Sequence, residues 1–441
     1  MKGRRLPQPR VAPVLLAAGV VLVAINLRPA AASIGPVLNR IQAETGLSSG
    51  WAGALTTLPV LCFGLLAPLA PVLARRLGVH TSIAVAMVVL VTGLLLRLIP
   101  GVGFLFLGTA LAGAAIATGN VLVPVVVRRD FANRTGTAMA LYTTSLIGFA
   151  ALAAGVTVPA ANALGGGWRP GLAIWAIPAL VAAVAWLPAL ARRDPRVDAP
   201  AHSAGAEAAG VDVPARGHSA RTLLRHPLAW QVTLFFALQS GGFYATLAWL
   251  PSIFRSHGAS DGHAGLLLSL SMIVGLATAL TVPGLAARHR DQRLLVIVGC
   301  ALTAAGLAGI LVAPMSASYL WVVLLGLGQN ATFPLALMMI VTRGGSVAST
   351  QGLSTLSQSV GYALAALAPL AVGAIHGVTG SWTPTLILLL ALVVPQLIVG
   401  LAAGRDRQLA GPPPPAPPNS RHPAVVPDGG QETATGSASA E

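Results

Sequence analysis

The sequence contains very little charge for its length. Of 441 residues, 9% are charged and 55% are hydrophobic, with a mean hydropathy of +0.77. A soluble protein is about 25% charged, so a chain with so little polar surface could not stay dispersed in water. The charge is also unbalanced, because 26 arginines and one lysine face 12 acidic residues, a net charge of +15. The composition therefore indicates a protein embedded in a membrane.

Cysteine is nearly absent as well. Cys62 and Cys300 both lie inside apolar runs, so the sequence implies no disulfide framework.

The long apolar runs contain no acidic residue. All twelve acids lie in loops or terminal segments: Glu44, Asp130, Asp194, Asp198, Glu207, Asp212, Asp261, Asp291, Asp406, Asp428, Glu432 and Glu441. No histidine lies deep in a run, since His376 is at the edge of one. The chain thus lacks an obvious intramembrane proton relay and an obvious partner for a cationic substrate. Paired histidines, cysteine pairs and glycine-rich phosphate loops are also missing, so we expect no enzyme activity, catalytic residue, metal site or cofactor.

Twelve apolar runs are long enough to cross a membrane, which takes about 20 residues. They lie near 12–36, 51–73, 81–99, 103–127, 136–160, 169–190, 228–252, 263–287, 293–313, 317–341, 351–375 and 381–403. The predicted fold is an all-α membrane protein with twelve transmembrane helices.

The basic residues predict the orientation. With the N-terminus inside, 22 basic residues fall in inner loops and only Arg40, Arg169 and Arg255 in outer ones. Such clusters anchor the cytoplasmic side of membrane proteins, which explains the net charge without nucleic-acid binding. This split predicts an even number of spans, with both termini cytoplasmic in a bacterial inner membrane. A signal peptide cleaved after Ala30-Ala31-Ala32 is the alternative, and it would leave eleven spans.

Three segments are expected outside the membrane. These are a cytoplasmic N-terminus (1–11), a connector (191–227) between six-helix bundles at 12–190 and 228–403, and a tail (404–441). The tail contains four consecutive prolines from Pro412 and ends in Gly, Ser, Ala and Glu, a composition typical of disorder. It could be passive or could bind a partner domain.

The two halves resemble each other at an offset of about 212 residues. The matches are Asn120-Val-Leu-Val-Pro124 with Asn330-Ala-Thr-Phe-Pro334, Gly148-Phe149-Ala150 with Gly361-Tyr362-Ala363, and Pro71 and Arg75 with Pro283 and Arg288. Three ordered matches indicate two parallel six-helix halves with a substrate site between them near the midplane.

Arg28 lies well inside the first predicted span. Placing an arginine there costs at least about 2.5 kcal/mol, and no acid in the spans can offset this cost. We expect Arg28 to face a wet central cavity and to bind an anionic or strongly polar substrate, with Pro29 loosening the backbone beside it. The alternative is that Arg28 extends to the membrane surface. That explanation is expected to suffice for Arg97, near the outer end of the third span.

Uncharged polar and aromatic residues in the spans are further candidates for substrate binding. They are Asn120, Tyr142, Gln239, Tyr244, Trp249, Gln329, Asn330, Gln358 and Tyr362. Each could instead form helix–helix hydrogen bonds, worth about 0.6–2 kcal/mol. Asn26 is about 200° around the helix from Arg28, so both are not expected to face the cavity.

Taken together, these motifs resemble the cyanate permease and 2-nitroimidazole exporter group of the major facilitator superfamily. The resembling segments are Asn26-Leu27-Arg28-Pro29, Ser33 with Gly35-Pro36, Gly119-Asn120 with Pro124, Arg129-Asp130-Phe131, Leu141-Tyr142-Thr143-Thr144, Trp168-Arg169, Gln239-Ser240 with Tyr244, Trp249-Leu250-Pro251, and Gln358-Ser359-Val360-Gly361-Tyr362. They run from residue 26 to about 382 and so cover nearly all of the predicted folded part.

The resemblance implies two bundles that work by alternating access on a small substrate, such as cyanate or a nitroimidazole. The chain departs from the superfamily signature after the second span, where Arg75 and Arg76 stand in place of the usual Asp-Arg pair. The usual cytoplasmic charge latch cannot form there, and we predict a gating role for these two arginines. Direction and coupling ion do not carry over, so facilitated diffusion, exchange and proton entry with the substrate stay open.

The sequence therefore predicts a monomeric carrier whose partners are a small-molecule substrate and the lipid bilayer. Two other hypotheses remain: an exporter of neutral aromatic compounds, in which Arg28 is structural, and a membrane sensor or scaffold that transports nothing.

Overall fold

The structure is a computed structural model that describes residues 13–131, 135–191, 223–345 and 347–409. This part of the chain is helical, with no strand. In its first half the helices are α1 (Pro13–Ala24), α2 (Pro29–Ala32), α3 (Ile34–Thr45), α4 (Ser49–Leu66), α5 (Leu69–Leu77), α6 (Val79–Leu96), α7 (Val102–Asp130), α8 (Thr135–Ala163), α9 (Trp168–Ala173), α10 (Ala176–Trp186) and the 3-10 helix η2 (Leu187–Ala191). In its second half they are α12 (Pro227–Ser256), α13 (Asp261–Arg288), α14 (Arg293–Val312), α15 (Ser318–Arg343), α16 (Val347–Ala365), α17 (Leu367–Thr379) and α18 (Thr383–Gly404).

Within these ranges, ten helices are long and apolar enough to cross a membrane. An eleventh span is the pair formed by residues 16–32 and 34–45, which bends by 41° at its break. The seventh predicted span corresponds to α12, which is 30 residues long but is not among these apolar helices. It carries Gln239, Ser240 and Thr246, and most of its side chains are buried inside the protein. Its lower hydropathy therefore fits a helix that faces protein more than lipid.

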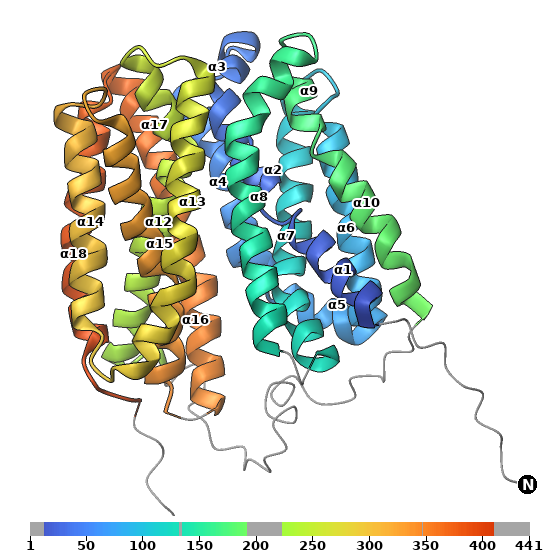
Figure 1. Ribbon diagram of the computed structural model, residues 1–441, viewed down its shortest axis with the longest axis vertical. Coiled ribbons are helices and arrows are strands. Elements are labelled where there is room, and N and C mark those ends of the chain that lie inside the picture. The colour runs from blue at the N-terminus through green and yellow to red at the C-terminus, as the bar shows by residue number, and fades with distance from the viewer. Residues whose placement is uncertain (1–12, 132–134, 192–222, 346, 410–441) are drawn as a thin grey trace, which may run out of the picture.

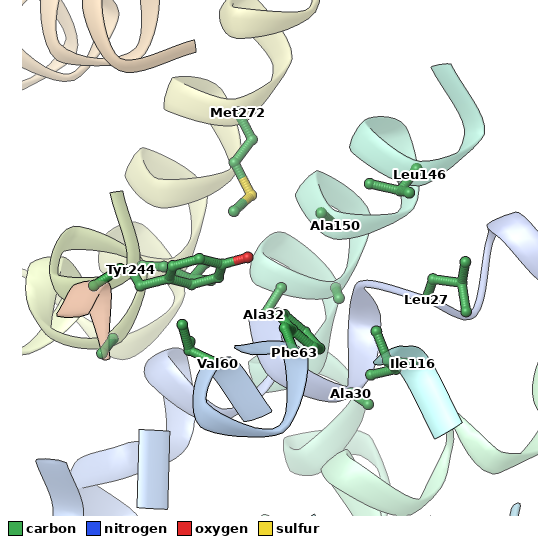
Figure 2. Packing of buried hydrophobic residues seen from close by; sticks show 14 of the residues in the cluster. Leu27, Ala30, Ala32, Val60, Phe63, Ile116, Leu146, Ala150, Tyr244 and Met272 are labelled. Atoms are coloured by element: carbon green, nitrogen blue, oxygen red, sulfur yellow. The ribbon is translucent and has the colours of Figure 1, made fainter. Parts of the chain in front are cut away.

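The helices form two bundles that stand side by side. Figure 1 shows α1 to α10 in one bundle and α12 to α18 in the other. The predicted fold class, an all-α membrane protein of two six-span bundles, is confirmed. One cluster of buried hydrophobic residues extends through both bundles, and Figure 2 shows part of it around Phe63, Ile116 and Tyr244.

One end of the molecule is rich in arginine. At this end α5, α7, α13, α15 and α18 finish and α12 begins (Figure 1). The arginines placed there are Arg75, Arg76, Arg129, Arg225, Arg288, Arg290, Arg293, Arg343, Arg405 and Arg407. We call it the arginine-rich end.

The bundles pack tightly against each other in the half away from the arginine-rich end. A Cβ atom added to Gly35 in α3 would lie 2.4 Å from the carbonyl oxygen of Leu247 in α12. A Cβ at Gly265 in α13 would lie 2.8 Å from the carbonyl oxygen of Ala154 in α8. Backbone therefore meets backbone across this interface, which only glycine allows.

Polar groups also join the bundles in this half. Arg40 in α3 forms an ion pair with Asp261 at the start of α13, with Nη2 and Oδ2 2.7 Å apart. Ser252 of α12 donates to Asn39 Oδ1 over 2.7 Å. Arg255, from the same bundle as Asp261, pairs with the other carboxylate oxygen at 2.6 Å. This end of the molecule is therefore closed.

The folded region extends past the predicted boundary at residue 404. The amide of Leu409 donates to the carbonyl of Arg343 over 2.9 Å, and the Leu409 side chain is buried. Arg343 in turn donates to the carbonyl of Gly404 over 3.0 Å. The proline-rich part of the predicted tail, the predicted N-terminal segment and most of the predicted connector lie outside the described residues.

Candidate functional site

A cavity of about 460 Å³ lies between the two bundles. Its lining residues come from α2, α4, α7 and α8 of the first bundle and their immediate neighbours, and from α12, α13, α15 and α16 of the second. Met139, Pro283 and Val341 line it on the side of the arginine-rich end, where the tight contacts described above do not occur. The cavity therefore extends from the middle of the molecule towards that end, and the opposite end is closed.

Arg28 is the charged residue among the described lining residues. It lies in a break of the first span, just before α2, where Pro29 cannot donate a backbone hydrogen bond. Its Nη1 donates to the hydroxyl of Tyr244 in the opposite bundle over 2.9 Å. Its Nε is buried and has no hydrogen-bond partner among the described residues. The guanidinium thus bridges the bundles and keeps donor capacity for a ligand.

Aromatic rings from both bundles pack around Tyr244, the partner of this guanidinium, with Phe63 coming from α4 and the others from α12 and α16. The ring centroids of Phe63, Tyr244 and Tyr362 lie 5.9–6.3 Å apart pairwise. Phe243 packs edge-on against Tyr244 at 5.3 Å. Figure 2 shows the Tyr244 hydroxyl directed towards the first bundle, with Phe63 close to it. We call Phe63, Phe243, Tyr244 and Tyr362 the aromatic cluster, and it offers flat apolar surface next to one positive charge.

Amide side chains complete the polar lining. Tyr142 donates to Asn120 Oδ1 over 3.4 Å, so these two predicted residues meet on the first bundle. Asn330, the repeat partner of Asn120, donates to the carbonyl of Gly326, and Gln358 donates to Ser354. Gln239 Oε1 is buried without a partner in the described part of the chain. Each amide therefore has capacity beyond its intramolecular bond for a polar ligand.

Eight of the ten predicted substrate-binding residues line this cavity. They are Arg28, Asn120, Tyr142, Gln239, Tyr244, Asn330, Gln358 and Tyr362. The structure places the other two, Trp249 and Gln329, elsewhere. The Trp249 indole is buried and donates to the carbonyl of Pro369 in α17, which joins α12 to α17. Gln329 accepts a bond from Thr246 inside the second bundle.

The predicted gating residues lie at the surface. Arg75 and Arg76 are exposed in the last turn of α5 and do not line the cavity. Their gating role stays a prediction.

Several apolar residues of the cavity were not predicted. Phe63, Phe243, Phe333, Met139, Met272 and Met338 all line it. An apolar side chain in an apolar helix gives no sign of facing a cavity, whereas a polar one does. Their position next to predicted residues, as with Phe243 beside Tyr244, was the one available signal.

Arg97 contradicts its prediction. Its side chain does not extend to the membrane surface but is 1% exposed, and its Nη1 donates to the carbonyl of Ala30 over 2.9 Å. Asn26 behaves as expected and faces away from the cavity, where it donates to the carbonyls of Leu22 and Pro178.

The chain belongs to the Major Facilitator Superfamily. The model of that family matches residues 15–366, which covers most of both bundles. Members of this superfamily are membrane transporters, which agrees with the expectation that the chain is not an enzyme.

Curated relatives carry names of transporters. The chain is 38% identical to the "Uncharacterized transporter YycB" of Bacillus subtilis, over 89% of this chain and 94% of the relative. It is 35% identical to the "2-nitroimidazole transporter" of Escherichia coli, over 90% and 97%. It is 32% identical to the "Cyanate transport protein CynX" of the same organism, over 82% and 90%. The predicted resemblance to this group is confirmed, and the chain is a multi-pass membrane transporter of small molecules.

Solved structures share the fold. A point mutant of the nucleoside transporter NupG has a TM-score of 0.71 at 14% identity, over 88% of this chain and 99% of that one. A bacterial homologue of the human lysosomal transporter Spinster, in an inward-facing and unoccupied conformation, has a TM-score of 0.71 at 16% identity, over 91% and 98%. These likenesses confirm the superfamily fold.

Proposed function

We propose that this protein carries a small anion, or a small polar organic molecule such as a cyanate-like or nitroimidazole-like compound, by alternating access. The proposal rests mainly on Arg28, a guanidinium in a mostly apolar cavity with a buried, unpartnered Nε. A buried cation without a carboxylate partner gains most from an anionic ligand, because the attraction between opposite charges is strong where water is scarce. The names of two relatives support substrates of this size.

The arrangement of the bundles supports alternating access. The cavity extends towards the arginine-rich end, which we propose to be the cytoplasmic side of a bacterial inner membrane, with both termini on that side. Closing the cavity there and separating Gly35 from Leu247 and Gly265 from Ala154 would expose Arg28 to the other side. Such rocking of one bundle against the other is how two-bundle transporters move their substrates.

The Arg28–Tyr244 bond suggests how the ligand enters this cycle. In the structure the hydroxyl of Tyr244 accepts a hydrogen bond from one N–H group of Arg28, and this bond links the bundles. A bound anion would compete for this guanidinium and touch both bundles at the same point. Amides such as Asn120 and Gln358 would complete its hydrogen bonds.

The decisive experiment is counterflow of labelled cyanate, and separately of labelled 2-nitroimidazole, in proteoliposomes. We expect uptake by the wild type of at least one of them and loss of at least about 90% of it in Arg28→Gln, with the variant still folded. Arg28→Lys keeps the charge but loses the planar donor fork, so it should be intermediate. Cyanate flux that is the same in the wild type and in Arg28→Gln would contradict the proposal.

The second candidate is an exporter of neutral aromatic compounds, which the aromatic cluster favours. In that case Tyr362→Leu should abolish 2-nitroimidazole flux, whereas Arg28→Gln should leave it nearly unchanged. The two variants therefore separate the candidates with one assay.

The scaffold hypothesis is tested by deletion. Because residues up to Leu409 pack against α15, the deletion should remove 410–441 only. A carrier should keep its transport rate after this deletion, whereas a scaffold that acts through the tail should lose its role.

A further inference from the structure

The first span is broken on both sides of Arg28. The backbone amides of Asn26 and Leu27 donate three residues back, to Val23 and Ala24, over 3.0 and 3.2 Å. This leaves the carbonyl of Leu22 without its regular helical donor, and the Asn26 side chain supplies one over 2.7 Å. Pro29 then removes another donor from the segment. Local hydrogen bonds alone therefore hold residues 25–28 weakly.

Two long-range hydrogen bonds hold this break from outside. Asn26 Nδ2 donates to the carbonyl of Pro178 in α10 over 3.1 Å. Arg97 Nη1, at the end of α6, donates to the carbonyl of Ala30 over 2.9 Å. These anchors lie two residues before and two residues after Arg28. Neither α6 nor α10 contributes to the cavity lining, so both anchors act from behind the site.

The protein accommodates Arg97 at a cost. The side chain is 1% exposed, and its Nε and Nη2 have no partner among the described residues. Space for it comes from Gly108 in α7, where a Cβ would lie 3.1 Å from Arg97 Cγ and 2.4 Å from the carbonyl oxygen of Gly93. A buried cation with one hydrogen bond does not stabilise a membrane helix bundle, because its desolvation is expensive. Its role is therefore to be sought in the segment that it contacts.

We propose that Asn26 and Arg97 are positioning residues that hold the broken segment so that Arg28 faces the cavity. The inference rests on the proposed function of Arg28 but concerns the orientation of its side chain, which can be measured without a substrate. Without the two anchors the segment can relax towards a regular helix. Residue 28 would then turn away from Tyr244.

The first test measures how accessible position 28 is. Arg28→Cys is introduced after replacement of the two buried cysteines, Cys62 and Cys300, by serine. The rate of its reaction with an anionic, membrane-impermeant methanethiosulfonate reagent is then compared with and without Arg97→Met. We expect Arg97→Met to lower this rate at least about fivefold, and Arg97→Lys, which keeps a donor, to restore most of it.

Two matched controls accompany this test. Asn330→Cys, elsewhere in the cavity, should react at the same rate in both backgrounds. Thr109→Val removes another fully buried polar group close by. Within the described ranges the Thr109 hydroxyl donates only to the carbonyl of Leu105 in its own helix, so this variant should leave position 28 unchanged. The proposal would be overturned if Arg97→Met left the reaction rate at position 28 unchanged. It would also be overturned if Arg97→Met lowered the reaction rates at positions 28 and 330 by the same factor.

The second test is a double-mutant cycle on the substrate that the wild type carries. If Arg97 acts through Arg28, Arg97→Met should raise KM about tenfold in the wild type and hardly at all in Arg28→Gln. If Arg97→Met does not fold, Asn26→Leu takes its place in both tests. Equal effects in both backgrounds would refute the positioning role while leaving Arg28 as the substrate contact. Failure of Arg28→Gln to affect transport would refute the proposed function instead.

Discussion

At the scale of single residues, Asn330 occupies space that only a glycine at position 275 leaves free. A Cβ on Gly275 in α13 would lie 2.2 Å from Asn330 Nδ2, so alanine must push the amide out of its place in the cavity wall. We expect Gly275→Ala to lower counterflow at least about fivefold. Gly284→Ala, in the same helix with open space around its Cβ position, is the control and should transport normally. Equal activity of the two variants would show that the position of Asn330 does not matter.

Individual residues also show what sequence patterns can and cannot predict. Arg28 could be predicted because a cation deep in an apolar span requires an explanation. Trp249 and Gln329 carry the same kind of signal as Tyr244 but bond inside the second bundle, and helical position alone does not separate the two cases. The prediction for Arg97 was wrong because its position near the end of a span suggested a side chain that extends to the membrane surface. The side chain instead turns inwards and donates to the carbonyl of Ala30.

At the scale of helices, contact through glycine lets the bundles separate and meet again. The carbonyl of Leu247 would lie 2.4 Å from any Cβ at position 35, so Gly35→Ala places a wedge between α3 and α12. We expect this variant to favour the state that is open on the side of α3 and α12. Site-directed spin-label distances across this end should lengthen. Gly50→Ala in α4, whose Cβ would meet nothing nearer than 3.9 Å, should leave them unchanged.

Helix number and order were predictable because each span needs a run of apolar residues of set length. The breaks within spans were less so. Pro29 suggested the break beside Arg28, but the anchors of this break on α6 and α10 come from residues far along the chain. The bend of 41° is a separate feature and lies between residues 32 and 34. The lower hydropathy of α12 reflects its burial inside the protein. Amino-acid composition alone cannot distinguish such a buried span from a helix that is too polar to cross a membrane.

At the scale of the whole molecule, the ion pair between Arg40 and Asp261 joins the bundles at the closed end. Both side chains are just over 20% exposed, so the pair should contribute no more than about 1 kcal/mol, or a factor of about five in the balance between the two states. We expect Asp261→Asn to shift the balance by up to that factor towards opening at this end, and raised salt to reduce the difference from the wild type. Spin-label distances across the closed end measure this shift.

A matched comparison separates the effect of the Arg40–Asp261 ion pair from a general effect of charge. Arg255 also pairs with Asp261, but both belong to the second bundle, so Arg255→Gln breaks no link between bundles. It should leave the distances across the closed end close to those of the wild type. A shift in Arg255→Gln as large as that in Asp261→Asn would show that the ion pair between the bundles is not what holds this end shut.

Arg28 also has a consequence for the response to membrane potential. Among the described lining residues it is the charged one, so the empty cavity carries one positive charge and a bound monoanion cancels it. Moving one charge through the full field is worth about 2.3 kcal/mol per 100 mV. Exchange of one anion for another should therefore be insensitive to voltage, whereas net transport, in which the empty carrier must return, should respond to potassium diffusion potentials imposed with valinomycin. In Arg28→Gln the loaded carrier bears the charge instead, so the rate of whatever exchange remains should become sensitive to voltage.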